Sequence, residues 1–140
     1  MLEQLSALHP DDRTRAFWEY CKRRELRFQQ CGGCGEFRFP PMQGCRSCGS
    51  TEHEWVAVSG RGRVFSYTNV VHPATPQIVE EVPYNVVVVE FDDAPGARLI
   101  SNVVGVGPGE VHVDMELDLC WEEPEAGVVL PRFRRVRSDP

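Results

Sequence analysis

Alternating apolar and polar residues dominate the second half of the chain. From Val111 to Glu122 every odd position is apolar, and every even position except Cys120 is polar. A period of two is typical of a β-strand with one face in water. Four further strands, separated by turns rich in proline and glycine, are predicted at residues 63–71, 84–91, 98–104 and 132–137. Five strands of this length are enough to close a small barrel, which would leave no exposed sheet edge.

The first thirty residues show a helical pattern instead. A helix is predicted for residues 13–25, with an apolar face formed by Ala16, Phe17, Tyr20 and Cys21. Asp11 or Asp12, which follow Pro10, would cap its N-terminus. A helix this short needs a surface to pack on, either the chain's own core or a partner protein. A second short helix is predicted over residues 1–9, and none is predicted after residue 30.

Between these regions lie two Cys-x-x-Cys pairs, each in a turn that contains or adjoins glycine. The pairs are Cys31 with Cys34 and Cys45 with Cys48, separated by ten residues. Four converging sulfurs suit a tetrahedral Zn²⁺, so we predict a zinc site, with two disulfides or four unrelated cysteines as the alternatives. Four thiolates leave no open position, which makes such an ion structural rather than catalytic. Short strands predicted at 26–30, 37–41 and 54–58 frame it as a small, rubredoxin-like zinc ribbon.

The chain is therefore predicted to be mainly β, in three parts. Residues 1–28 form an N-terminal helical segment, residues 29–58 the zinc ribbon and residues 59–140 the barrel, with Ser59-Gly-Arg-Gly at the last junction. No stretch has the ~20 apolar residues of a membrane-spanning helix, and the N-terminus lacks a signal-peptide pattern, so we expect a cytoplasmic protein. A reducing compartment favours zinc over disulfides and leaves Cys21 and Cys120 as buried free thiols.

Charge is unevenly distributed along the chain. Residues 1–63 carry ten Lys and Arg against eight Asp and Glu, a net of +2, whereas residues 64–140 carry five against thirteen, a net of −8. Zinc ribbons and small barrels often bind nucleic acid, but phosphate contacts need a basic surface. Phe65, Tyr67 and Tyr84 could stack on bases, although aromatic residues on strands more often belong to the core. Nucleic-acid binding is therefore an alternative function rather than the first choice.

No catalytic arrangement is evident in the sequence. His9 and His53 are predicted in loops, His72 at a strand end and His112 on a polar strand face, none at a catalytic spacing from a serine, cysteine or carboxylate. The segment Gly105-Val-Gly-Pro-Gly joins two strands, so a turn is favoured over a nucleotide-binding loop. An active site of the chain's own is therefore poorly supported.

Several motifs occur in a specific order over residues 15–135. They are Phe17-Trp18, Gln30-Cys-Gly-Gly-Cys-Gly, Pro40-Pro41, Cys45-Arg-Ser-Cys-Gly-Ser, the run from Trp55 to Thr68, the run from Pro83 to Phe91, and Ser101-Asn-Val-Val-Gly. The ordered set resembles a family of zinc-ribbon and OB-fold proteins that accompany acyl-CoA enzymes, especially thiolases. Similar sequences often have glycine where this chain has Asp114, before Met115.

The resemblance implies an OB-fold barrel, a bound Zn²⁺ and an accessory role. Such a subunit helps to hold an acyl-CoA, or its pantetheine arm, for a thiolase-fold, aldolase, acyltransferase or hydratase partner, and no nucleic acid or membrane is expected as a partner. The amide-bearing arm would fit along a strand edge, with candidate contacts at Arg61, Arg63, Ser66, Thr68, Tyr84 and Asn102. Ordinary strand packing is the commoner role of each side chain. Phe17 and Trp18 are candidate contacts to the partner.

Overall fold

The structure is a computed structural model, and it describes residues 12–136. Its helix, α2, spans Arg15–Lys22 and is shorter than the predicted 13–25. Thr14 occupies the N-cap position without a side-chain capping bond, while Asp12 forms an ion pair with Arg15 at 3.0 Å. Asp11, His9 and the helix predicted over residues 1–9 lie outside the described residues. No helix of the described part is long and apolar enough to cross a membrane.

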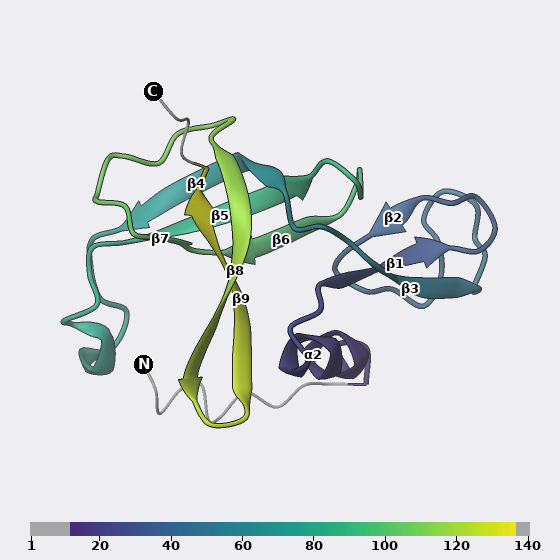
Figure 1. The fold of residues 1–140 in the computed structure, drawn as a ribbon, viewed down its shortest axis with the longest axis horizontal. Coiled ribbons are helices and arrows are strands. Elements are labelled where there is room, and N and C mark those ends of the chain that lie inside the picture. Colours follow the sequence, from purple (N-terminus) through teal and green to yellow (C-terminus); the bar gives the residue numbers. More distant parts are fainter. Residues whose placement is uncertain (1–11, 137–140) are drawn as a thin grey trace.

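A small antiparallel sheet follows the helix, in the strand order β2-β1-β3. Its strands are β1 (Arg27–Cys31), β2 (Phe37–Arg38) and β3 (His53–Ala57). The predicted return strand over 37–41 is wrong beyond its first two residues, because Pro40 and Pro41 have no backbone N–H to donate to a ladder. This sheet and its two loops form one end of the molecule (Figure 1).

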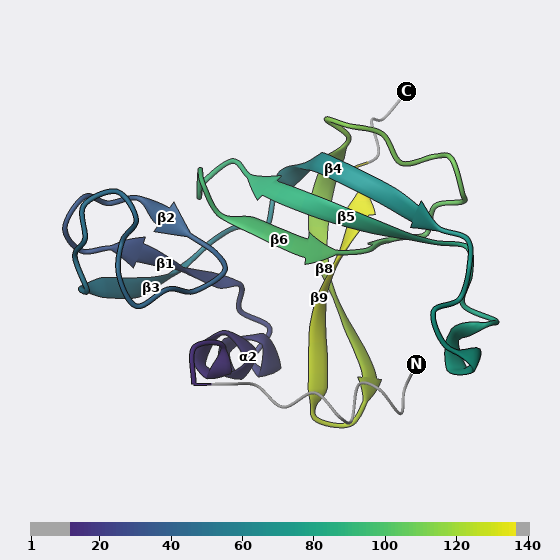
Figure 2. The ribbon, with the colours of Figure 1, turned by 180° about the vertical axis from the view of Figure 1, so that it is seen from behind.

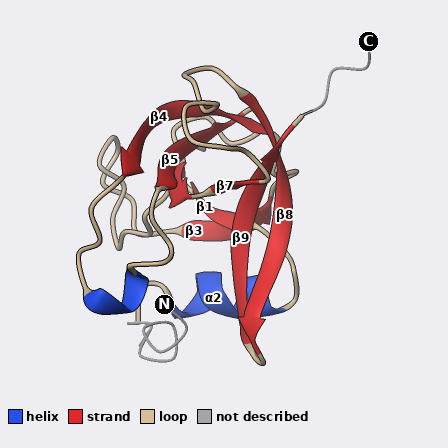
Figure 3. Cartoon of the chain, turned by 90° about the vertical axis from the view of Figure 1, so that its left-hand side faces the viewer, coloured by secondary structure: helices blue, strands red, loops and turns tan. Residues whose placement is uncertain are grey.

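The remaining strands form a six-stranded sheet in the order β6-β5-β4-β8-β9-β7. The strands are β4 (Gly62–Val70), β5 (Tyr84–Phe91), β6 (Arg98–Ser101), β7 (Val103–Val104), β8 (Glu116–Glu125) and β9 (Val128–Arg135). A single 3₁₀ turn, Pro76–Ile78, joins β4 to β5, although no helix had been predicted there. The sheet curls strongly, with β4 and β5 facing β8 and β9 (Figure 3).

The hydrogen-bonded ladder is not closed within residues 12–136, so the prediction of a fully closed barrel is wrong in this respect. The strand predicted over 98–104 divides at Asn102, because the Asn85 side chain takes the place of a neighbouring strand. Asn85 Oδ1 accepts a hydrogen bond from the Val103 N–H at 2.7 Å, and Asn85 Nδ2 donates to the Val103 carbonyl at 2.8 Å. β6 then pairs with β5, while β7 pairs in parallel with β9.

The alternating segment from Val111 to Glu122 is only partly a strand. β8 begins at Glu116, because Asp114 has a left-handed backbone with φ of 69° and its N–H donates to the Val64 carbonyl at 2.9 Å. Val111 and Met115 are buried all the same, which accounts for the misleading pattern. β8 and β9 continue beyond the sheet as a long hairpin, and α2 lies between this hairpin and the small sheet (Figure 2).

One core joins the helix, the small sheet and the large sheet. It contains a chain of aromatic contacts in which the Phe17 and Phe39 rings lie 4.6 Å apart, Phe39 and Phe28 5.3 Å, Phe28 and Phe91 4.9 Å, and Phe91 and Phe133 5.9 Å. The three parts therefore stabilise one another through the burial of shared apolar surface. Cys21 is a buried free thiol in this core, as predicted, whereas Cys120 is only half-buried.

Candidate functional site

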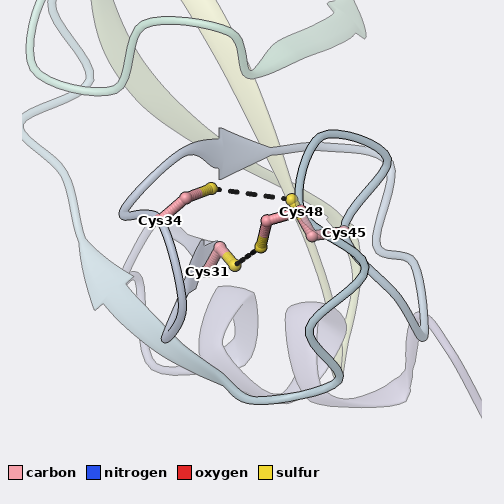
Figure 4. A group of neighbouring side chains, drawn as sticks. All are labelled: Cys31, Cys34, Cys45 and Cys48. Carbon is pink, nitrogen blue, oxygen red and sulfur yellow. Dashed lines mark hydrogen bonds between the residues drawn. The ribbon is translucent and has the colours of Figure 1, made fainter.

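The four paired cysteines lie together at the far end of the small sheet (Figure 4). Cys31 ends β1, and Cys34, Cys45 and Cys48 come from the two adjoining loops; all four sulfurs lie within 4.8 Å of one another. The Cys31 and Cys48 sulfurs are 3.5 Å apart and the Cys34 and Cys45 sulfurs 3.7 Å. Disulfide sulfurs would be about 2.05 Å apart. Four sulfurs at 2.3 Å from one tetrahedral ion would be about 3.8 Å apart, so the arrangement fits Zn²⁺.

Backbone N–H groups support the sulfurs in the same way in both loops. The Gly33 N–H points to Cys31 Sγ at 3.3 Å, and the Ser47 N–H to Cys45 Sγ at 3.4 Å. Backbone donors, the Cys34 N–H first, lower the pKa of the Cys31 thiol to about 6. The pKa of Cys45 is likewise lowered, with the Cys48 N–H as the largest cause. The first cysteine of each pair is therefore held toward the thiolate form that a metal requires.

The other two thiols ionise less readily. The pKa of Cys34 rises to about 12: the Glu36 N–H lowers it, but desolvation and the neighbouring sulfurs raise it by more. The pKa of Cys48 is also raised, since the Cys31 sulfur and desolvation together outweigh the Ser50 N–H. A divalent cation would hold all four sulfurs as thiolates.

The close approach of the two loops also explains why residue 33 is a glycine. A Cβ atom at this position would lie 2.9 Å from Ser50 Cβ and 3.1 Å from Cys48 Sγ. Any larger residue would push the second loop away and separate the sulfurs. Gly33 is thus a functional residue that the sequence indicated only as part of a glycine-rich turn.

Four of the six candidate acyl-CoA contacts follow one strand. Arg61 precedes β4, and Arg63, Ser66 and Thr68 belong to it. β5 pairs with β4 along its whole length, whereas β8 pairs with it only at Gly62 and Arg63. Within residues 12–136, the edge of β4 from residue 65 to residue 70 therefore has no backbone partner. Such an edge can accept an extended chain that carries amide groups.

Both arginines at the start of β4 are exposed and ion-paired. Arg61 Nε lies 3.2 Å from an Asp118 carboxylate oxygen, while Arg63 lies 3.8 Å from Glu90 and 4.0 Å from Asp92. Exposed pairs of this kind contribute ~0–1 kcal/mol to stability. An incoming phosphate could therefore compete for either guanidinium at little cost.

Tyr84 and Asn102 lie at the opposite end of β4. Tyr84 is opposite Val70 in the β4–β5 ladder and, with Asn102, lines a depression of about 360 Å³ beside the 3₁₀ turn. The Asn102 amide donates to the Asn85 carbonyl, so part of its bonding capacity is used to hold the sheet together. No local pattern indicated Asn85, because its two hydrogen bonds to the Val103 backbone depend on the tertiary fold.

The two aromatic residues proposed as partner contacts differ in exposure. Phe17 is 1% exposed and packs against Phe39, so most of its surface belongs to the core, and its role as a partner contact stays a prediction. Trp18 is half-buried and lines a groove of about 560 Å³ between the helix, the small sheet and the large sheet. Trp18 therefore stays a candidate.

Several residues lie in places that differ from the prediction. Phe65 and Tyr67, expected in the core, are 42% and 40% exposed on β4. His53 is the first residue of β3 rather than a loop residue, and His112 lies in the turn before β8 rather than on a strand. Among the described residues, neither these histidines nor His72 forms a hydrogen bond to a serine, a cysteine or a carboxylate.

The chain matches two domain families along most of its described length. Residues 18–54 match the rubredoxin-like zinc ribbon domain of ChsH2, and residues 55–122 match the ChsH2 C-terminal OB-fold domain. The chain belongs to this ChsH2 zinc-ribbon and OB-fold family. The predicted resemblance and the predicted fold class are thereby confirmed, with the sheet left open as described above.

Relatives of the chain are subunits or scaffolds. A probable enoyl-CoA hydratase alpha subunit of Thermomonospora curvata is 39% identical over 124 residues, which are 88% of this chain and 38% of that protein. A DUF35 domain-containing scaffold protein of Methanocaldococcus jannaschii is 30% identical over 124 residues, 87% of this chain and 77% of that protein. This chain thus spans well under half of the hydratase subunit.

A solved structure shares the whole arrangement. A chain of the Ltp2-ChsH2(DUF35) aldolase superposes with a TM-score of 0.81 at 34% identity, covering 91% of this chain and 98% of that one. Almost the whole of that aldolase chain therefore has the same fold as this chain.

Proposed function

We propose that the chain is an accessory subunit of an acyl-CoA-processing enzyme complex, in which it binds or positions the acyl-CoA for a separate catalytic partner of the thiolase fold or a related class. The observation that carries the proposal is the superposition on almost the entire length of a chain from the Ltp2-ChsH2(DUF35) aldolase. The hydratase subunit among the relatives supports an acyl-CoA substrate. The catalytic groups then belong to the partner.

Zinc has a structural part in this proposal. One Zn²⁺ would be held by Cys31, Cys34, Cys45 and Cys48. Its bonds to the four sulfurs would link the two loops that carry these cysteines. A four-thiolate site offers no position for substrate, so the ion stabilises the fold and takes no part in the reaction. The core contacts of Phe39 and Phe28 transmit this order to the helix and to the large sheet.

The pantetheine arm is proposed to lie along the open edge of β4. Arg61 and Arg63 at one end suit the phosphates of coenzyme A, and Tyr84 and Asn102 at the other end suit the polar groups near the thioester. From residue 63 to residue 70 the strand is about 23 Å long, enough for an extended amide-bearing chain. Exposure of both faces of β4 from Phe65 to Asn69 leaves room for such a ligand.

Copurification tests the accessory role. The tagged chain, expressed in its own host, is expected to bring down one acyl-CoA enzyme in a fixed ratio that nuclease treatment does not change. A fixed ratio with a nucleic-acid-processing enzyme, or loss of the partner on nuclease treatment, would overturn the proposal.

A binding measurement tests the position of the arm. Calorimetric titration of the purified complex with coenzyme A should show affinity reduced at least tenfold by R61Q together with R63Q, since loss of even one charged hydrogen bond to phosphate costs about 1.5 kcal/mol or more. Lys22→Gln, which removes an equally exposed positive charge from α2, is the matched control and should leave the affinity unchanged. Equal affinities for all variants would exclude the β4 edge as the binding site.

A further inference from the structure

A groove of about 560 Å³ lies where α2, the small sheet and the large sheet meet. Its apolar part includes Trp18, Pro40 and Ile100, and its charged part consists of Arg46, Arg98 and Arg132. We call it the arginine groove. No residue of β4 lines it, although Arg98 lies against Phe65 of β4 and Arg132 also lines the depression beside Tyr84 and Asn102.

The charge of the arginine groove opposes that of the protein. The chain carries 21 Asp and Glu against 15 Lys and Arg, yet within residues 12–136 the groove is lined by three arginines and by no Asp or Glu. The arginines come from three places, namely the second cysteine loop, β6 and β9. Their convergence is thus a product of the tertiary fold, and it creates a local site for negative charge.

The three guanidinium groups are poorly neutralised. Arg46 lies 4.0 Å from Glu36, and Arg132 lies 3.9 Å from Glu122, both at the limit for an ion pair. Arg98 has no carboxylate within 4.0 Å in the described part of the chain, and its guanidinium instead lies over the Phe65 ring at 3.8 Å. Arg98 is therefore held in place by the ring while its charge stays available.

The apolar side chains of the arginine groove are largely exposed, and no other part of this chain covers them in the described residues. Ile100 on β6 is 70% exposed, and the partly exposed Val88 of β5 lies opposite it in the ladder. Phe65, beside Arg98, extends the exposed apolar surface beyond the groove. A small ligand inside the groove would leave much of this surface in water, whereas a protein surface could cover all of it.

We infer that the arginine groove docks a segment of the partner acyl-CoA enzyme in which apolar side chains stand beside Asp or Glu; this rests on the proposed function. Cores of protein interfaces are enriched in Arg and aromatic residues and depleted of Asp and Glu, as this surface is. A second copy of the chain is disfavoured, because a two-fold interface would place the same arginines against one another. The carboxylates of the partner would pair with Arg98 first.

Photo-crosslinking tests the location of the contact. The full-length chain with p-benzoylphenylalanine in place of Ile100 is expressed in its own host, and the crosslinked peptide is identified by mass spectrometry. The same probe in place of Val113, an exposed apolar residue in the turn before β8, is the matched control. We expect Ile100 to crosslink to an apolar segment containing Asp or Glu, and Val113 to give no such product.

The alternative outcomes are distinct. A crosslink to a second copy, to a segment without Asp or Glu, or to no protein at all while the acyl-CoA enzyme still copurifies would overturn the docking inference and leave the proposed function intact. A crosslink to an apolar, acidic segment of a protein that is not an acyl-CoA enzyme would overturn the proposed function while leaving a docking site for an acidic segment.

Charge reversal tests the chemistry of the contact. Arg98→Glu should weaken binding of the crosslinked partner at least tenfold, and Arg135→Glu, a surface residue paired with Glu110 outside the groove, should change it less than twofold. Changing the crosslinked Asp or Glu of the partner to Arg should restore binding to Arg98→Glu. Equal binding by both variants, or no restoration, would show that Arg98 does not pair with the partner. Unchanged melting of both variants establishes that the fold is retained.

Discussion

At the residue scale, Asp114 shows how one backbone conformation sets the start of a strand. Its φ of 69° is in the left-handed region, which glycine adopts freely and which a residue with a branched Cβ adopts only with strain. Aspartate is among the residues that tolerate the conformation best. The turn brings Met115 into the core, where its carbonyl accepts a hydrogen bond from the Val64 N–H at 3.0 Å.

Replacing Asp114 by glycine and by a branched residue should therefore have different effects on the free energy of unfolding. Asp114→Gly is expected to change the free energy of unfolding by no more than about 1 kcal/mol, because relief of strain offsets the greater freedom of the unfolded chain. Asp114→Val should lower it by about 1–3 kcal/mol. Urea denaturation measures both, with His112→Val as the control for adding valine to the same turn. A stable Asp114→Val variant would contradict the left-handed conformation.

The second prediction at this scale is that the four cysteines bind Zn²⁺. The purified protein should contain about one Zn²⁺ per chain with four sulfur ligands near 2.3 Å, measurable by elemental analysis and X-ray absorption. Cys31→Ser should lose the metal and unfold the ribbon, since structural zinc contributes folding free energy directly. Cys120→Ser, the control, should keep the metal. A metal-free protein with an ordered ribbon would refute the assignment.

At the element scale, α2 is attached to the rest of the chain through its aromatic face. Phe17 is buried against Phe39, while its neighbour Trp18 lies half-buried at the wall of the arginine groove. Consecutive residues of a helix point about 100° apart, so one of them can serve the core and the other a partner. The helix therefore contributes both to the stability of the chain and to the surface proposed to contact the partner.

Alanine substitutions should distinguish these two roles. Phe17→Ala is expected to lower the free energy of unfolding of the isolated chain by about 3–5 kcal/mol, the usual cost of truncating a buried phenylalanine. Trp18→Ala should lower it by less but weaken assembly with the partner more. Thermal melts of the isolated variants and pull-downs of the complexes give the two quantities. If Phe17→Ala left the melting temperature unchanged and abolished assembly, α2 would face the partner with its buried side instead.

Some elements could be predicted because their signals are local. The period-two pattern and the β-branched composition placed β4 and β5 within one residue, and the spacing of the cysteines placed them side by side. The alternation failed before Glu116, because Val111 and Met115 are buried from a turn rather than from a strand, and Val113 between them is 53% exposed. The division of the strand at Asn102 depends on the Asn85 side chain, which bonds the Val103 backbone from 18 residues earlier in the sequence.

At the scale of the whole molecule, function depends on surfaces that several segments form together. The arginine groove combines residues from the helix, the second cysteine loop and three strands, so no sequence pattern could indicate it. The open edge of β4 likewise depends on tertiary pairing, because β8 pairs with β4 only at Gly62 and Arg63. The sequence indicated which residue types could bind a ligand or a partner, but it did not indicate which of those residues would lie together in space.

The distribution of charge predicts weak binding of nucleic acid. Phe65 and Tyr67 are exposed and could stack on bases, but residues 64–140 carry a net charge of −8, which repels a phosphate backbone. Single-stranded DNA and RNA should therefore bind no better than weakly and without sequence preference at physiological salt, as measured by fluorescence anisotropy. Submicromolar affinity under those conditions would favour the nucleic-acid-binding alternative.

The most direct test of the accessory role is a comparison of turnover with and without the partner. The isolated chain should show no thiolase, aldolase, hydratase or hydrolase activity on acyl-CoA thioesters. Added to the acyl-CoA enzyme that copurifies with it, the chain should raise turnover, because misplacing a thioester by about 1 Å can cost ~100-fold in rate. Turnover by the isolated chain at roughly 1 s⁻¹ or more, or a partner whose rate and stability do not change when the chain is added, would contradict the accessory role.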